Sequence, residues 1–156
     1  MTVWHLAQMN IAKARAPLDD PLLAEFVANL DRINALADRS PGFVWRLQSD
    51  SGNATDIRAF DDPRMIVNLS VWRSYDELAD YVYRSDHTRV MVRRREWFER
   101  LPRPFLVLWW AAAGTLPTVA DGLSRLDRLA RHGASPPAFT LRERFPAPEE
   151  APLLAV

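Results

Sequence analysis

The chain has 156 residues, no cysteine, a formal net charge of zero and 48% apolar residues. This length suits a single domain that can bury a core of its own. The lack of cysteine excludes disulfides, thiolate metal sites and a cysteine nucleophile. The balanced charge provides no field that would attract nucleic acid. No run approaches the ~18 apolar residues of a membrane span, and the first residues lack the pattern of a signal peptide, so we expect a cytoplasmic protein that does not bind membranes.

Apolar periodicity and turn residues predict the elements of the first half of the chain. They are a strand over 2–10, a helix over 19–42, strands over 42–48 and 64–72, and a polar loop or hairpin arm over 49–63. The helix has clear ends, because Asp20 is a good N-cap, Pro21 suits the first helical position, and Pro41 with Gly42 stops the helix.

The second half continues in the same manner. It predicts helices over 75–83, 86–101 and 119–133 and strands over 104–113 and 138–145. Ser74 and Glu77 match a capping box, and Thr118 can cap the last helix, which Gly133 ends. The tail 146–156 is rich in proline and glutamate, and we expect it to be disordered.

The order of these elements predicts an α+β protein with the split βαβ pattern of ferredoxin-like folds. An antiparallel sheet would carry helices on one face, and a further helix and strand would follow at the C-terminus. We expect one domain over residues 1–145. The second face of the sheet needs a cover, and the simplest one is another copy of the chain, which favours a homodimer.

The predicted helix over 86–101 has a histidine and an arginine in its apolar stripe. The spacing i, i+3, i+4, i+7 selects His87, Val90, Met91, Arg94, Trp97, Phe98 and Leu101. An inward Arg94 needs a partner, which could be a carboxylate, a backbone carbonyl or an anionic ligand. His87, in the first turn, should be neutral and could act as a general base, or it could be a core histidine bonded to the backbone.

The strands supply the second half of a candidate site. On the third strand Asn68, Ser70 and Trp72 share a face, whereas the other face is wholly apolar and should meet the helices. The polar face would then line the interior between the two sheets of a dimer. Asn10 from the first strand and Trp110 from the fourth would complete an apolar cavity with few polar groups. Alternatively, the two asparagines satisfy sheet edges or each other.

The chain also resembles a known superfamily. The order of the elements, the helix 86-DHTRVMVRRREWF-98 and the run 109-WWAAAGTLPT-118 are similar to the dimeric α/β barrels, and most similar to a bacterial family of unknown function within them. The resemblance covers roughly residues 3–145. The superfamily includes cofactor-free monooxygenases, isomerases, polyketide cyclases and haem enzymes, and no catalytic motif of any member maps onto this sequence.

Together these observations favour an enzyme that acts on a bulky apolar substrate, aromatic or polyketide-like. The chemistry would be cofactor-free acid/base catalysis of the monooxygenase, isomerase or cyclase type, with specialised metabolism as its setting. The expected catalytic residues are His87, Arg94 and Asn68. The expected substrate-binding residues are Asn10, Trp72, Met91, Trp97 and Trp110.

Two alternatives remain open. One is a haem protein with His87 as axial ligand, which the superfamily resemblance implies. The other is a protein without catalytic activity that binds a hydrophobic metabolite. The three histidines show no metal-binding spacing, so no metal site is expected.

Overall fold

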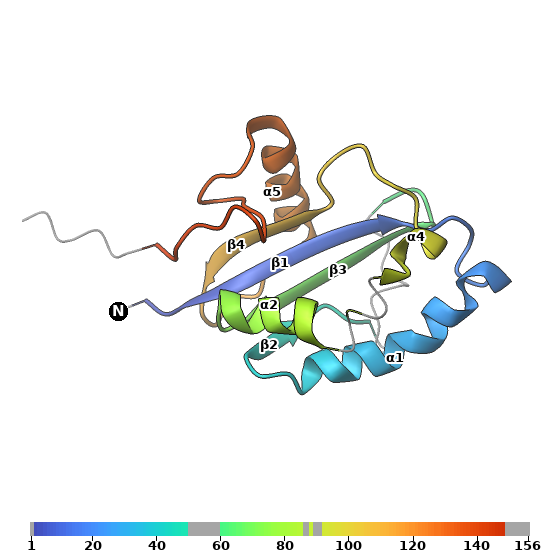
Figure 1. Ribbon diagram of the computed structural model, residues 1–156. Helices are drawn as coiled ribbons and strands as arrows, with labels where there is room; N and C mark the ends of the chain where they lie inside the picture. The colour runs from blue at the N-terminus through green and yellow to red at the C-terminus, as the bar shows by residue number, and fades with distance from the viewer. Residues whose placement is uncertain (1, 50–59, 86–87, 89–91, 149–156) are drawn as a thin grey trace, which may run out of the picture.

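The computed structural model describes residues 2–49, 60–85, 88 and 92–148 (Figure 1). Within them the strands form one antiparallel sheet in the order β2-β3-β1-β4. The strands are β1 (Trp4–Lys13), β2 (Phe43–Arg46), β3 (Met65–Trp72) and β4 (Leu106–Ala112). The helices are the 3-10 turn η1 (Pro21–Leu23), α1 (Ala24–Asp38), α2 (Tyr75–Arg84), α4 (Arg94–Trp97) and α5 (Val119–His132). The predicted α+β class with a ferredoxin-like antiparallel sheet is confirmed.

The predicted helix starts coincide with side-chain caps. Asp20 accepts a hydrogen bond from the backbone N–H of Leu22 at 2.9 Å, although the first turn there is a 3-10 turn. Ser74 and Thr118 cap α2 and α5 in the same way. Gly133 follows α5 with a φ of 76°, a conformation that glycine adopts without strain.

The two faces of the sheet are covered by different helices (Figure 1). The apolar face packs on α5 through a buried cluster that contains Met9, Leu69, Trp109, Leu126 and Leu129. The opposite face, which carries the polar side chains of β1 and β3, meets α1 and α2. It contributes Leu6, Trp72 and Leu108 to a second buried cluster.

The expected orientation of the polar face therefore needs correction. Ser70 is buried between the sheet and the helices of its own chain without a second sheet, whereas Asn68 lines the same cavity and is exposed. The apolar face meets a helix, as expected, but that helix is α5. The reason is that α5 carries its own apolar stripe, which buries the most hydrophobic face, whereas α1 and α2 leave a gap above the polar one.

The prediction of one helix up to residue 101 is wrong. The helix α4 ends at Trp97, and Phe98 has extended backbone with φ −125° and ψ 142°. The chain there pairs with the end of β1, since the N–H of Glu99 donates to the carbonyl of Lys13 at 2.8 Å. Trp97 and Phe98 are therefore both buried, although they do not share one helical stripe.

The predicted strand over 138–145 is also wrong. The backbones of Leu108 and Phe139 exchange two hydrogen bonds, of 2.8 and 2.9 Å, and form an isolated bridge. The chain then turns, with the N–H of Glu143 bonded to the hydroxyl of Thr140 at 3.0 Å. The segment nevertheless belongs to the core, because Phe139 is fully buried.

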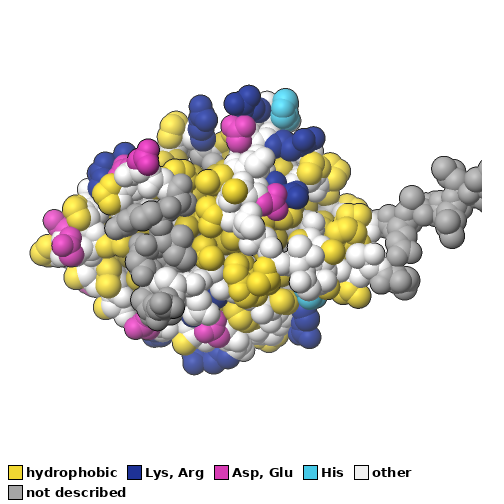
Figure 2. Space-filling model, turned by 180° about the vertical axis from the view of Figure 1, so that it is seen from behind, with side chains coloured by type: hydrophobic (Ala, Val, Ile, Leu, Met, Phe, Trp, Pro, Cys, Tyr) yellow, Lys and Arg dark blue, Asp and Glu magenta, His cyan; other side chains and the backbone are white. Residues whose placement is uncertain are grey.

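The reverse side of the molecule shows hydrophobic side chains across its middle and charged side chains around its edge (Figure 2). Partly buried apolar residues around the cluster that packs on α5 include Trp45, Leu47, Val119 and Leu123.

In the part of the chain that the structure describes, no helix combines the length and apolar character needed to cross a bilayer.

Candidate functional site

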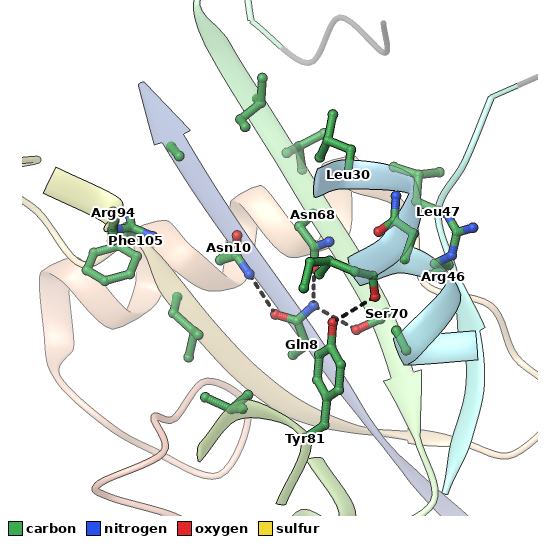
Figure 3. Close-up of a pocket in the computed structure, with 18 of the residues that line it drawn as sticks. Gln8, Asn10, Leu30, Arg46, Leu47, Asn68, Ser70, Tyr81, Arg94 and Phe105 are labelled. Carbon is green, nitrogen blue, oxygen red and sulfur yellow. Dashed lines mark hydrogen bonds between the residues drawn. The ribbon is translucent and has the colours of Figure 1, made fainter. Parts of the chain in front are cut away.

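A cavity of about 190 Å³ lies between the sheet and the helices α1, α2 and α4 (Figure 3). Its floor is the polar face of β1 and β3. The floor residues are Gln8, Asn10, Ala12, Ile66, Asn68, Ser70 and Trp72. Apolar side chains of α1 and α2 form the walls, among them Phe26, Leu30, Ile33 and Leu78. The site thus has an apolar shell around a few polar groups, as expected of a small-molecule pocket.

The polar floor is organised by the buried side chain of Gln8, which is 5% exposed. Its Nε2 donates to Oδ1 of Asn68 at 2.5 Å and to Oγ of Ser70 at 2.7 Å. Its Oε1 accepts from Nδ2 of Asn10 at 3.2 Å. The indole N–H of Trp72 donates to the same Ser70 oxygen at 2.9 Å. Figure 3 shows Gln8 joined by dashed lines to Asn10, Asn68 and Ser70.

This pattern determines which groups remain for a ligand. Gln8 occupies the carbonyl oxygen of the Asn68 amide, and among the described residues no hydrogen bond uses its NH₂ group. Ser70 already accepts two hydrogen bonds, which fill the two lone pairs of its hydroxyl and leave the O–H to donate. Asn68 and Ser70 therefore offer donors to the cavity, whereas Asn10 uses its NH₂ group on Gln8. Donors stabilise a negatively charged oxygen.

Tyr81 forms part of the aromatic wall and is not a free acid or base. Its ring stacks on Trp72 with centroids 5.0 Å apart, and Phe43 meets Trp72 edge-on at 5.6 Å. The hydroxyl of Tyr81 donates to the carbonyl of Ile33 at 3.3 Å. Burial raises the pKa of Tyr81, so the phenol stays protonated at neutral pH.

The two ends of the cavity each carry an arginine (Figure 3). At one end Arg46 forms an ion pair with Asp38, with 2.7 Å between Nε and Oδ1. At the other end the guanidinium of Arg94 lies 4.2 Å from the centroid of the Phe105 ring. Burial lowers the pKa of Arg94, yet the side chain remains a cation at neutral pH because a guanidinium loses its proton only far above neutrality.

Of the residues predicted for the site, the cavity brings together Asn10, Asn68, Trp72, Arg94 and Trp97. Trp110 is placed elsewhere: it is absent from the lining, and its indole N–H donates to the carbonyl of Phe145 at 2.8 Å. His87 and Met91 lie outside the described residues, so their predicted roles stay predictions.

Sequence reasoning missed the central role of Gln8. The alternation of β1 places Gln8 on the same face as Asn10, so that part of the signal was present. Phe105 and the α1 side chains were also missed. Periodicity does not show which helix packs on which face of the sheet, so it could not show that α1 lies above the polar face.

The described lining gives no support to a metal or to haem at this site. Nowhere in the described residues do three or more His, Cys, Asp or Glu side chains form a group that could hold a metal ion. The described lining also contains no histidine, cysteine or methionine that could serve as an axial ligand, and the hydroxyl of its Tyr81 already donates to the carbonyl of Ile33. A cavity of about 190 Å³ is smaller than the ~300–1,000 Å³ usual for small-molecule and cofactor sites, so it suits a ligand much smaller than haem.

Residues 5–154 match the sequence profile of a family described as "Domain of unknown function (DUF3291)". No curated protein sequence matches the chain. Among solved structures, the chain is similar to SnoaB, a cofactor-independent oxygenase from Streptomyces nogalater, with 21% identity and a TM-score of 0.50. That match covers 73% of this chain and 98% of SnoaB.

The chain is also similar to a protein of unknown function from Nitrosomonas europaea, with 14% identity and a TM-score of 0.45. This match covers 74% of this chain and 97% of that protein. At 21% identity the similarity to SnoaB shows the fold alone, which is that of the dimeric α/β barrels. The resemblance noted in the sequence is thereby confirmed.

Proposed function

This chain belongs to the DUF3291 family, whose description assigns no activity, and we propose that it is an enzyme that stabilises an oxyanion of a small aromatic substrate by cofactor-free chemistry. The observation that carries the proposal is the orientation of the polar floor. Gln8 occupies the acceptor oxygen of Asn68 and one lone pair of Ser70, so donors remain for the substrate. Donors of this kind favour ionisation of a phenol or enol in an apolar pocket.

The size of the cavity narrows the expected substrate. About 190 Å³ compares with the ~150 Å³ of an apolar cavity that binds benzene. The volume supports a ligand of one or two fused rings at this site. The aromatic walls around Trp72 and Tyr81 favour a flat ring system over a flexible chain.

Oxygenation is the finer form of the proposal, and it is supported by the similarity to a cofactor-independent oxygenase. The ionised substrate would give one electron to O₂, and the resulting superoxide would combine with the substrate radical at carbon. Loss of water from the hydroperoxide converts CH₂ and O₂ into C=O and H₂O. All electrons come from the substrate, so no added reductant is needed. Isomerisation or cyclisation would use the same oxyanion without O₂.

A phenolic probe tests oxyanion stabilisation before the natural substrate is known. We expect 2-naphthol bound to the full chain to ionise about one to two pH units below free 2-naphthol, as judged from its absorbance. Replacing Asn68 by Ala should remove most of this shift. Asn68→Asp should raise the pKa of the bound phenol, because a carboxylate would then face the phenolate.

Asn29→Ala is the matched control. Asn29 also lines the cavity, but its amide is engaged within α1, with Nδ2 donating to the carbonyl of Glu25 at 2.7 Å. The pKa of naphthol bound to this variant should equal the wild-type value. Bound naphthol that ionises like free naphthol would overturn oxyanion stabilisation. It would favour the alternative, a binder of hydrophobic metabolites without catalytic activity.

Oxygen consumption with 2-indanone, a bicyclic ketone with acidic CH₂ groups, tests the oxygenase form. One O₂ should disappear per 2-indanone consumed, without release of H₂O₂, and Asn68→Ala should abolish the reaction. The predicted role of His87 as the group that moves the proton is tested in the same assay. Full turnover by His87→Ala would exclude that role.

A homodimer remains part of the proposal. The partly buried apolar residues around the cluster that packs on α5, such as Trp45 and Leu123, support an interface with a second copy on that side. Light scattering at several concentrations tests it directly. A monodisperse monomer would exclude the homodimer, and the pocket proposal would stand, since its described lining comes from one chain.

A further inference from the structure

Arg94 occupies a well-defined position at one end of the cavity. Its guanidinium carbon lies 4.2 Å from the centroid of the Phe105 ring and 5.9 Å from that of Phe98. Phe98 and Phe105 are the first and last residues of the loop that joins α4 to β4. Stacking on aromatic faces fixes the plane of the guanidinium and leaves its N–H groups to point along that plane.

The charge of Arg94 has no counter-charge within the described residues. The other cavity arginine, Arg46, is neutralised by Asp38, whereas no carboxylate of a described residue forms an ion pair with Arg94. The pKa of Arg94 is lowered by burial, and no neighbouring charge opposes that effect. A partly buried cation is costly unless an anion joins it, so this end of the cavity is suited to a negatively charged group.

The polar floor and Arg94 are separate features of one cavity. Figure 3 shows Asn10 between Arg94 and the network centred on Gln8, and all three line the same space. Asn68 and Arg94 can therefore bind two different groups of one ligand. A rigid ligand would place one substituent at Asn68 and another at Arg94.

We propose that Arg94 binds a carboxylate of the ligand, so that the pocket takes a hydroxylated aromatic acid with its hydroxyl at Asn68 and its carboxylate at Arg94. The hydroxyl end rests on the proposed function, whereas the carboxylate end rests only on Arg94 and its surroundings. A carboxylate matches the planar fork of a guanidinium and accepts two parallel hydrogen bonds from it.

Binding of three related probes to the full chain tests the proposal by calorimetry. The probes are 2-naphthol, 6-hydroxy-2-naphthoate and the neutral 6-hydroxy-2-naphthamide. The wild-type chain should bind the carboxylate about ten to a hundred times more tightly than either neutral probe. Equal affinity for the carboxylate and the amide would overturn the proposal without any variant.

Substitutions locate the preference. Arg94→Gln should bring the affinities for carboxylate and amide to within about twofold of each other and leave the affinity for 2-naphthol unchanged. Arg94→Lys keeps the charge but loses the planar fork, so it should retain part of the preference. Arg103→Gln, which alters an exposed arginine outside the lining, should behave as wild type. A preference that survives Arg94→Gln would overturn the assignment to Arg94.

The two proposals fail separately in this design. Asn68→Ala, which adds no charge, should change the ionisation of the bound hydroxyl in all three probes but leave the preference for the carboxylate intact. A carboxylate preference without a lowered phenol pKa would refute the proposed chemistry and support the Arg94 subsite. The reverse result would refute the subsite alone.

Discussion

The side-chain nitrogen of Gln8 donates to Oδ1 of Asn68 across the β1–β3 pair, at 2.5 Å. The contact is diagonal, because Gln8 lies opposite Ser70 in the strand register and Asn68 lies opposite Asn10. One amide thus orients two neighbours on the adjacent strand. This makes Gln8 a positioning residue: it acts on a ligand through Asn68 and Ser70.

Replacing Gln8 by Leu tests this role. The variant removes the donor to Asn68 and Ser70, so the Asn68 amide can turn its oxygen toward the cavity. We expect the pKa of bound 2-naphthol to rise by about one unit, to near its free value, with little change in affinity for the neutral phenol. The free energy of unfolding should fall by about 1–3 kcal/mol because buried polar groups lose their partner.

Gln48→Leu is the control for this substitution. Gln48 is exposed and lies outside the cavity lining, so neither the pKa of bound naphthol nor the stability should change appreciably. If Gln8→Leu loses stability but keeps the naphthol pKa at its wild-type value, Gln8 has only a structural role.

Tyr81 makes the stability of the chain sensitive to alkaline pH. Burial raises its pKa in the folded state, whereas in the unfolded chain it ionises near 10.0. Above pH ~10 the unfolded state therefore releases a proton that the folded state keeps, and stability falls as pH rises. Below that pH the full contribution is present. The loss should approach about 1.4 kcal/mol per pH unit for one group.

Urea unfolding at pH 8, 10 and 11 measures this dependence. Tyr81→Phe should flatten the alkaline decrease, although part of it should remain because burial also raises the pKa of Tyr75. Tyr83→Phe is the matched control, since Tyr83 is 58% exposed and its replacement should leave the decrease unchanged. Lys13 is the only lysine, which keeps other alkaline titrations few. A Tyr81→Phe variant with the wild-type decrease would refute the assignment.

The parts of the fold that the sequence predicted correctly depend on local signals. Ser74 and Thr118 cap their helices through hydrogen bonds that span only three residues, so the sequence contains all the necessary information. The strand β3 was found because apolar residues recur at every second position from Met65 to Val71. The end of α4 was missed because it depends on pairing with Lys13, which lies far away in the chain.

The candidate site was predictable to a similar extent. Strand alternation placed Asn10 and Asn68 on one face, and the structure joins them through Gln8. What covers that face was not predictable from periodicity, because α1, α2 and α5 are all amphipathic. The choice between the two faces is made by long-range packing. Trp110 lies on the same face as Trp72, but the C-terminal segment engages it away from the cavity, since its indole N–H donates to the carbonyl of Phe145.

The segment 138–145 should contribute strongly to stability even though it is not a strand. Phe139 is fully buried against Leu6, Trp72 and Leu108, in the buried cluster between the sheet and α2. Phe139→Ala should lower the free energy of unfolding by about 3–5 kcal/mol. Leu116→Ala, at a position that is 55% exposed, should change it by less than about 0.5 kcal/mol. A loss below about 1 kcal/mol for Phe139→Ala would show that the segment does not pack as described.

The approach of α5 to the sheet depends on Gly122. A Cβ at this position would lie 2.2 Å from Sδ and 3.2 Å from Cγ of Met9, which is fully buried and has little room to move. Helix propensity alone would favour Gly122→Ala by about 1 kcal/mol, but the clash should dominate and lower the free energy of unfolding by about 1–3 kcal/mol. In a Met9→Ala background the clash is absent, so adding Gly122→Ala there should be neutral or stabilising. Chemical denaturation of the wild type, the two single variants and the double variant measures the coupling between the two sites. Ser124→Ala, at an exposed position of α5, is the control. Additive effects of the two substitutions would contradict the close contact of α5 with β1.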